Sequence, residues 1–287
     1  MEQQAAASRC QSCGGSFYVC FSDGLAARAR RCECQASCPL CGGTGHAART
    51  DEQGYDVFSV CRCQSVDRRI SRFNRALLPA KFHDRTLFNY TPASEPQAAA
   101  QSAVYQFLRN YQSGCQGFLL MGPVGTGKTH LLCAVVSHLC LELGVIARFI
   151  DFFQLLQNLR EGFSQNRPTS ELLAPLEQVP VLAIDELGKG KNTEWELSIL
   201  DEVISKRYNQ QKTTLFTTNY TDDRETTFTV SLQDPKVSPV KTARQTSLDR
   251  RVLKETLEER VGPRIYSRLR EMCAFSMVVG PDHRATK

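Results

Sequence analysis

The stretch Gly122-Pro-Val-Gly-Thr-Gly-Lys-Thr129 decides the fold of this chain, because it matches the G-x-x-x-x-G-K-[ST] loop that binds nucleotide phosphates. An apolar run at residues 118–121 precedes it and a helical pattern at residues 131–143 follows, which is the strand–loop–helix context that the motif requires. Glycine-rich backbone lets amide groups turn toward phosphate oxygens, and the positive end of the next helix faces the same anion. The sequence therefore predicts a nucleoside triphosphate site. The alternative is a Gly-rich turn that matches by chance.

Two side chains of this loop carry chemistry. Lys128 is expected to place its charge on the outer phosphates, and the Thr129 hydroxyl to ligate Mg²⁺. The predicted cofactors here are ATP and Mg²⁺, and the predicted nucleotide-binding residues are Gly122, Pro123, Val124, Gly125, Thr126, Gly127, Lys128, Thr129 and His130.

Strand and helix patterns alternate after the loop. Strands are expected at residues 145–150, 179–184 and 213–217, with Asp151 and Thr193 placed to cap the helices between them. Repeated βα units imply a parallel sheet whose ligands lie at the carboxyl ends of the strands. The predicted fold class is α/β, a P-loop parallel sheet flanked by helices.

Polar residues stand where two of these strands end. Asp185 closes an apolar strand, as expected of a carboxylate that ligates Mg²⁺, and Glu186 is the natural general base for the attacking water. Asn219 follows a further strand and can hydrogen-bond the water and the γ-phosphate, although a turn-forming asparagine explains it as well.

Composition excludes several classes of protein. The 287 residues are 41% hydrophobic and 23% charged, with a net charge of +5, as in an ordinary globular protein with room for one α/β domain and a smaller one. No secretory signal and no membrane-spanning run is recognised, so we expect a cytoplasmic protein with reduced thiols and no membrane partner.

The thirteen cysteines are therefore informative, because disulfides do not explain them. A C-x-x-C pair followed by a C-x-C pair occurs twice, with a period near 28 residues. Each copy offers four thiolates, enough for a tetrahedral zinc site, and few apolar residues, so we expect two structural zinc ions. Scattered free thiols or a redox cluster are alternatives, and separate or interleaved sites remain open. The predicted ligands are Cys10, Cys13, Cys32, Cys34, Cys38, Cys41, Cys61 and Cys63.

Residues 38–45 also resemble the C-x-x-C-x-G-x-G knuckle of DnaJ-type zinc domains, from which we take only the metal geometry.

The expected domains are a cysteine-rich domain at 1–65, a linker at 66–95 and an ATPase domain at 96–287. Residues 221–247 form a polar insertion that we expect to be flexible. A basic stretch at 67–75 reads as a short helix that lies on nucleic acid, on the next domain or in solvent.

Together, the loop with His130, Leu-Ala-Ile-Asp-Glu186 and Thr-Thr-Asn219 resemble the AAA+ ATPases of the DnaC/IstB type, which are bacterial helicase loaders and transposition helpers. Residues 76–82 and 259–269 support the resemblance, which covers roughly residues 76–287. It implies an AAA+ fold with an absent or vestigial helical lid. It also implies that Asp185 and Glu186 are Walker B residues, Asn219 is sensor 1, Arg268 is the arginine finger and Arg284 occupies the sensor 2 position.

The arginines can also be placed from the sequence itself. Gly262-Pro263 ends one helix and begins another, on which Arg264 and Arg268 share a face. Two guanidiniums on a rigid helix can reach the γ-phosphate of a neighbouring subunit. Which of them does so stays open, and surface ion pairs or DNA phosphates are alternative partners.

The resemblance implies an ATP-dependent helicase loader that binds a DnaB-type hexameric replicative helicase and single-stranded DNA. Such a protein self-assembles through its ATP site and hydrolyses ATP to release the helicase. One alternative is an IstB-like transposition helper on duplex DNA, and another is an ATP-switched zinc adaptor without significant turnover. A DnaJ-like holdase is disfavoured because no J-domain precedes the cysteines.

Overall fold

The computed structural model describes residues 10–35, 41–42, 44–50, 54–222 and 255–284. The chain forms two compact units, Met1–Asp84 with Val136–Ala147, and Arg85–Val135 with Arg148–Lys287. Residues 66–84, which the sequence analysis assigned to a linker, therefore group with the first unit, and residues 85–95 group with the second.

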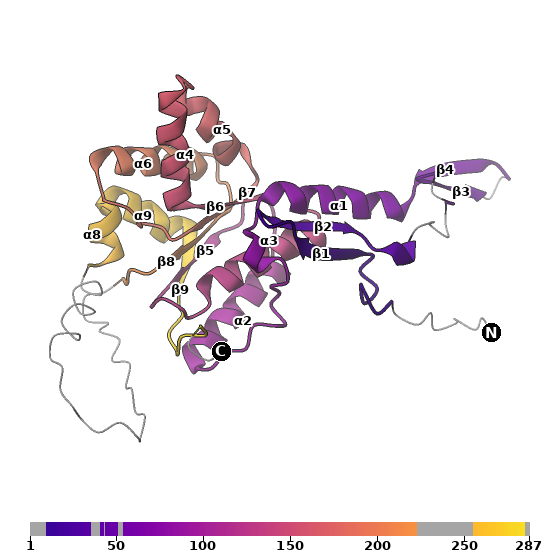
Figure 1. Cartoon of the computed structure of the whole chain (residues 1–287), viewed down its shortest axis with the longest axis horizontal. Coiled ribbons are helices and arrows are strands. Elements are labelled where there is room, and N and C mark those ends of the chain that lie inside the picture. The colour runs from indigo at the N-terminus through magenta and orange to yellow at the C-terminus, as the bar shows by residue number, and fades with distance from the viewer. Residues whose placement is uncertain (1–9, 36–40, 43, 51–53, 223–254, 285–287) are drawn as a thin grey trace. The chain divides into compact units, whose positions relative to one another are not determined.

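A five-stranded parallel sheet organises the second unit (Figure 1). Its strands, in spatial order, are β6 (Ala147–Asp151), β7 (Val181–Asp185), β8 (Thr214–Thr218), β5 (Gly117–Met121) and β9 (Cys273–Met277). Every residue of the three central strands is buried, which requires helices on both faces.

Helices supply that cover (Figure 1). In chain order they are α2 (Glu95–Arg109), α3 (Lys128–Leu141), α4 (Phe152–Ser164), α5 (Thr169–Gln178), α6 (Glu194–Asn209), α8 (Leu257–Val261) and α9 (Pro263–Met272). Asp151 caps α4 through the Gln154 amide, and Thr193 forms a full capping box with Glu196 at the start of α6. Both caps were predicted from sequence, whereas α5 was not.

The core of this unit lies between the sheet and the helices α4, α5, α6, α8 and α9. Its largest contributors are leucines, isoleucines and phenylalanines that are at most 5% exposed, among them Leu119, Leu156, Leu182, Ile184, Phe216 and Leu269. The sheet is therefore a rigid platform for the polar residues at its carboxyl edge.

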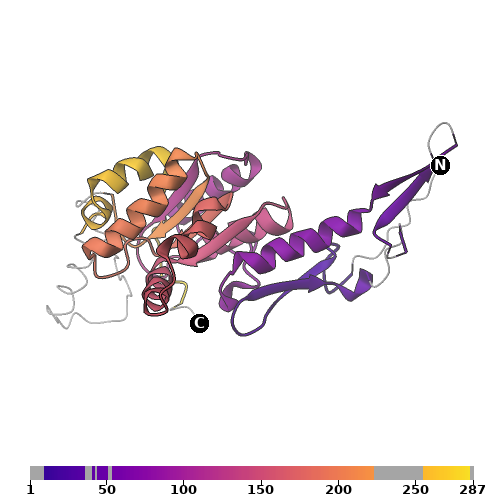
Figure 2. The same cartoon turned by 90° about the horizontal axis from the view of Figure 1, so that it is seen from above.

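The first unit contains two antiparallel hairpins and a helix (Figure 2). The elements are β1 (Tyr18–Ser22), β2 (Ala27–Arg31), η1 (Glu33–Gln35), β3 (His46–Thr50), β4 (Asp56–Val60), α1 (Arg62–Ala76) and η2 (Ala80–Phe82). The side chain of Asn74 on α1 bonds both the N–H and the C=O of Ala29, at 2.7 and 3.0 Å. Phe73 is fully buried, so the first hairpin has a small core.

The second hairpin has no such cover. Tyr55, Val57, Phe58 and Val60 are 50–69% exposed. Since buried apolar surface cannot stabilise the hairpin of β3 and β4, this hairpin requires another source of stability. In the described part of the chain, no helix has the length and apolar character needed to cross a membrane.

Candidate functional site

Three adjacent strands bring the predicted site residues to one edge of the sheet. The phosphate loop follows β5, Asp185 ends β7 and Asn219 comes directly after β8, and these strands are neighbours in the order β7-β8-β5. Because parallel strands end at the same edge, residues far apart in sequence meet there.

Lys128 is almost completely buried beneath the loop, at 6% exposure. Its ammonium donates to the carbonyls of Gly122 and Pro123, at 2.8 and 2.6 Å. Burial, and secondarily the charge of Arg284, lowers the pKa of Lys128 to about 8, against the opposing effect of Asp185. The ammonium is thus short of strong acceptors, which phosphate oxygens would supply.

Asp185 is fixed by two hydroxyl groups. Thr129 Oγ1 lies 3.1 and 3.0 Å from its two carboxylate oxygens, and the Thr217 hydroxyl donates to Oδ1. Burial raises the pKa of Asp185 to about 6, while these hydrogen bonds oppose the rise. A hydroxyl beside a carboxylate is an all-oxygen donor set that suits Mg²⁺. Thr217 is a site residue that sequence reasoning did not assign, although it stands in the quoted Thr-Thr-Asn219 stretch.

Glu186 has a left-handed backbone conformation, with φ 56°, directly after Asp185. Its amide donates to Thr217 Oγ1 at 3.0 Å, and its carboxylate forms an ion pair with Lys189 three residues on. The two carboxylates therefore have different partners, Lys189 for Glu186 and the hydroxyls of Thr129 and Thr217 for Asp185.

Tyr90 packs over the loop. Its hydroxyl donates to the carbonyl of Thr126 at 3.0 Å, and a Cβ on Gly127 would lie 2.4 Å from its ring. Glycine is therefore required at position 127 for this close approach as well as for the φ of 94°. His130, for which nucleotide binding stays a prediction, contacts the Thr86 carbonyl at 2.9 Å and the Tyr90 ring.

The segment after β9 returns to the same loop. The amide of His283 donates to the carbonyl of Gly125 at 3.0 Å, and Arg284 follows directly, with an exposed side chain. Asn219 is half-buried at the end of β8. The structure thus brings the predicted sensor residues to the edge that carries Lys128 and Asp185.

Arg264 and Arg268 lie on α9 and share one carboxylate on α6. Arg268 donates to Asp201 at 2.7 Å, while Arg264 lies 3.7 Å from it. The Arg264 side chain is 73% exposed and that of Arg268 only 20%. Arg268, which the family resemblance favours as the arginine finger, is therefore the arginine that pairs closely with Asp201 of its own chain.

The cysteines of each sequence repeat lie together in a group of their own. Cys10, Cys13, Cys32 and Cys34 form one group and Cys41, Cys61 and Cys63 form another, with the sulfurs of each group within 4.8 Å of one another. Nearest sulfur pairs are 3.5–3.7 Å apart, close to the edge of about 3.8 Å expected around a tetrahedral zinc ion. The residues therefore fit zinc.

The surroundings of the sulfurs agree with that fit. The Gly45 amide lies 3.3 Å from the Cys41 sulfur, as in a zinc knuckle. Within the first group, backbone amides, that of Cys13 first, lower the pKa of Cys10 to about 6, whereas the hydrogen bond with Cys32 raises the pKa of Cys34. Cys20 belongs to neither group, and burial raises its pKa to about 11. Cys38 and most of the predicted insertion, residues 223–254, lie outside the described residues.

A parallel sheet of this order, with a phosphate loop after β5 and an acidic pair at the end of β7, on the far side of β8, defines a P-loop ATPase fold of the AAA+ class. Residues 59–243 match the model of the family described as "IstB-like ATP binding protein", and the chain belongs to that family.

Comparison with individual proteins agrees. The chain is similar to the replicative helicase loader DnaC of Escherichia coli K12, with 29% identity over 149 residues, which cover 51% of this chain and 60% of DnaC. A crystal structure of the DnaC helicase loader shares the fold, with a TM-score of 0.53 and 24% identity over 69% of this chain and 99% of that one. A structure of DnaI does likewise, with a TM-score of 0.53 and 20% identity over 74% of this chain and 99% of that one.

Proposed function

We propose that this protein hydrolyses ATP to load a hexameric replicative helicase of the DnaB type onto single-stranded DNA. The observation that carries the proposal is an intact hydrolytic arrangement, Lys128 with Asp185 and Glu186, in a chain similar to DnaC. The matched region covers 60% of the length of DnaC. The helicase and the single-stranded DNA are therefore proposed partners.

Each residue has a distinct task in this proposal. Lys128 binds the outer phosphates, Glu186 accepts the proton of the attacking water, and Asn219 hydrogen-bonds the γ-phosphate. Mg²⁺ would be held by Thr129 and Asp185, and would neutralise charge on the phosphates. An arginine from a neighbouring subunit completes the site, so turnover of the isolated chain is slow and self-assembly accelerates it.

The two cysteine groups support a separate task for the first unit. With zinc bound, they hold hairpins that bury little apolar surface, and such a unit serves as an adaptor that grips the helicase. ATP hydrolysis in the second unit then releases the helicase.

The decisive experiment is co-purification with the replicative helicase of the same organism. We expect Glu186→Gln, which binds ATP and hydrolyses it far more slowly than the wild type, to retain the helicase, and Cys61→Ser/Cys63→Ser to lose it. Cys20→Ser is the matched control, because Cys20 lies outside both cysteine groups. A helicase that is captured equally well by the double cysteine variant contradicts the adaptor role.

The family description favours a second candidate, an IstB-like transposition helper on duplex DNA. If no variant captures helicase and ATP drives filaments on duplex DNA, this candidate replaces the loader. If the chain binds ATP without turnover under every condition, an ATP-switched zinc adaptor replaces both.

A further inference from the structure

The loop after Glu186 links β7 to α6 and must keep the proposed general base in place. Glu186 itself adopts a left-handed conformation, with φ 56°, which is strained for a residue other than glycine. The Leu187 amide donates to the Thr217 carbonyl at 2.8 Å, and the Thr218 hydroxyl donates to the Leu187 carbonyl at 2.9 Å. These bonds hold only the first part of the loop.

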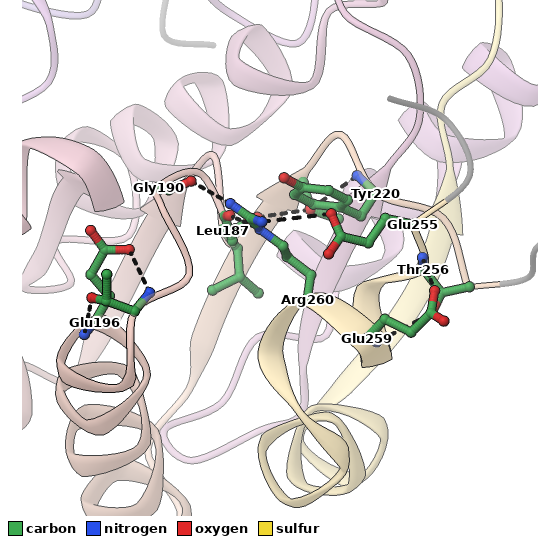
Figure 3. A network of polar contacts seen from close by, with 11 residues as sticks. Leu187, Gly190, Glu196, Tyr220, Glu255, Thr256, Glu259 and Arg260 are labelled. Atoms are coloured by element: carbon green, nitrogen blue, oxygen red, sulfur yellow. Dashed lines mark hydrogen bonds and ion pairs between the residues drawn. The ribbon is translucent and has the colours of Figure 1, made fainter. Parts of the chain in front are cut away.

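Arg260 of α8 holds the second part (Figure 3). Its Nε donates to the carbonyl of Gly188 at 2.6 Å, and a terminal nitrogen donates to the carbonyl of Gly190. The two carbonyls flank Lys189, whose ammonium pairs with the Glu186 carboxylate. One guanidinium therefore spans the part of the loop that faces Glu186.

Packing alone would not hold this part of the loop. A small pocket lies beside it, lined by Gly188, Gly190, Glu196 and Arg260 among others. A Cβ on Gly188 would meet the Arg260 side chain at 2.9 Å, so the arginine lies directly against the backbone. Hydrogen bonds from a planar, forked donor fix two carbonyls at once, which a single ammonium cannot do.

Arg260 is itself held firmly. Its guanidinium lies over the ring of Tyr220, 5.3 Å from the centroid, and 3.6 Å from the Glu255 carboxylate. The side chain is only 13% exposed. Helix α8 begins with a capping box of Thr256 and Glu259 (Figure 3), so the arginine projects from a fixed base.

We infer that Arg260 is a positioning residue for ATP hydrolysis, which fixes the Gly188–Gly190 backbone and so keeps Glu186 aimed at the attacking water. The role rests on the proposed ATPase function. Arg260 acts through the backbone that follows Glu186, because its guanidinium donates to the carbonyls of Gly188 and Gly190. Because α8 leads directly into α9, which carries Arg264, the same residue links the chain's own Glu186 to the helix proposed to contact a neighbour's ATP.

The test measures kcat, KM and the affinity for a fluorescent ATP analogue in the full chain, assembled with Mg²⁺, single-stranded DNA and the replicative helicase. Arg260→Ala should lower kcat about 10- to 100-fold, while analogue affinity stays within about threefold. Arg160→Ala is the matched control, because Arg160 pairs with Glu196 at 2.8 Å in the same region without reaching the loop carbonyls. It should keep wild-type kcat.

A double variant separates positioning from general stability. If Arg260 acts through Glu186, Glu186→Gln/Arg260→Ala should be no slower than Glu186→Gln alone. The inference would be overturned if the decreases in kcat of the two single variants multiplied in the double variant. It would also be overturned if the affinity for the ATP analogue fell together with kcat.

Arg260→Lys keeps the test decisive if the alanine variant does not fold. Lysine can reach one carbonyl only, so an intermediate kcat at unchanged analogue affinity is expected, and wild-type kcat overturns the inference. A wild-type chain without turnover overturns the proposed ATPase function and this role with it. Turnover in the wild type together with normal turnover in both Arg260 variants overturns this role alone.

Discussion

Arg264 and Arg268 show how the surroundings of a residue can decide its role when its sequence position does not. Both lie on one face of α9, yet Arg268 pairs closely with Asp201 and lies 5.9 Å from the ring centroid of Tyr208, whereas Arg264 is largely exposed. A residue that must reach into a neighbouring subunit needs a guanidinium that its own chain holds only weakly. We therefore propose Arg264, which is more exposed and lies farther from Asp201, as the arginine finger.

We therefore predict that Arg264→Ala abolishes most of the acceleration that assembly gives to ATP turnover, by about 10³-fold. Mixing these subunits with Glu186→Gln subunits should restore activity, because each partner supplies what the other lacks. The readout is phosphate release against mixing ratio.

Arg268→Ala should instead lower the melting temperature by removing a contact between α6 and α9. Rescue of Arg268→Ala but not of Arg264→Ala in the mixing assay would reverse the assignment.

His138 on α3 gives a prediction for pH. Burial lowers the pKa of His138 below 6.5, so the unfolded chain takes up a proton that the folded chain resists. The folded state is therefore destabilised as the pH falls through 6.5, and not above it. We predict that His138→Gln reduces the loss of urea midpoint between pH 7.5 and pH 5.5. An equal loss in both proteins would exclude this histidine as a cause.

At the scale of single residues, the sequence predicted the positions of those that belong to a short local motif. Lys128, Thr129 and Asp185 lie together as their spacing implied, because the strands that carry them are adjacent. The role of Arg260 could not be predicted, since it meets its target through contacts between elements that are distant in sequence.

At the scale of elements, α6 is tied to the sheet by a fully buried arginine. Arg207 donates to the carbonyls of Leu176 and Val179 at 2.8 Å, to that of Thr213 at 2.7 Å, and to the Thr214 hydroxyl at 2.9 Å. Burial lowers its pKa to about 10, so it remains charged at neutral pH. It joins the end of α5 to the starts of β7 and β8.

We predict that Arg207→Met lowers the free energy of unfolding by about 3–5 kcal/mol, because the carbonyls stay buried and lose their donor. Urea denaturation followed by circular dichroism measures the change. Lys206→Ala is the control. Lys206 is 42% exposed and pairs with Glu177 and Glu202, so its loss should cost less than about 1 kcal/mol. Similar losses for the two variants would contradict the role of Arg207.

Elements with strong local signals were predicted well. The capped helices α4 and α6 and the break at Gly262-Pro263 occur as expected. The two hairpins of the first unit and α5 were missed. Their residues carry weak periodicity, and in the hairpins the arrangement depends on cysteine groups whose geometry is not local.

At the scale of the whole molecule, each hairpin of the first unit has a cysteine group of its own. Because the sulfurs gather copy by copy, we predict two separate zinc sites. Cys32→Ser should lose about one equivalent of zinc and retain the other, as measured by elemental analysis. Release of both ions from this single variant would indicate a shared site.

The second unit should not depend on those ions. Its sheet and buried core contain none of the eight predicted zinc ligands. We predict that a strong zinc chelator abolishes helicase capture and leaves the affinity for a fluorescent ATP analogue unchanged. A parallel loss of nucleotide binding would contradict this separation.

Thr221 and Thr256 form a parallel bridge, and the Leu257 amide donates to the Thr221 carbonyl at 2.7 Å. The chain therefore leaves the sheet edge and returns to it at a single point, whatever lies between. The free energy of closing a loop depends only weakly on its length, so an insertion between two points this close should cost the strands little stability. The same point offers protein engineers a place to splice in a fluorescent reporter, close to Arg260, the residue proposed to position Glu186.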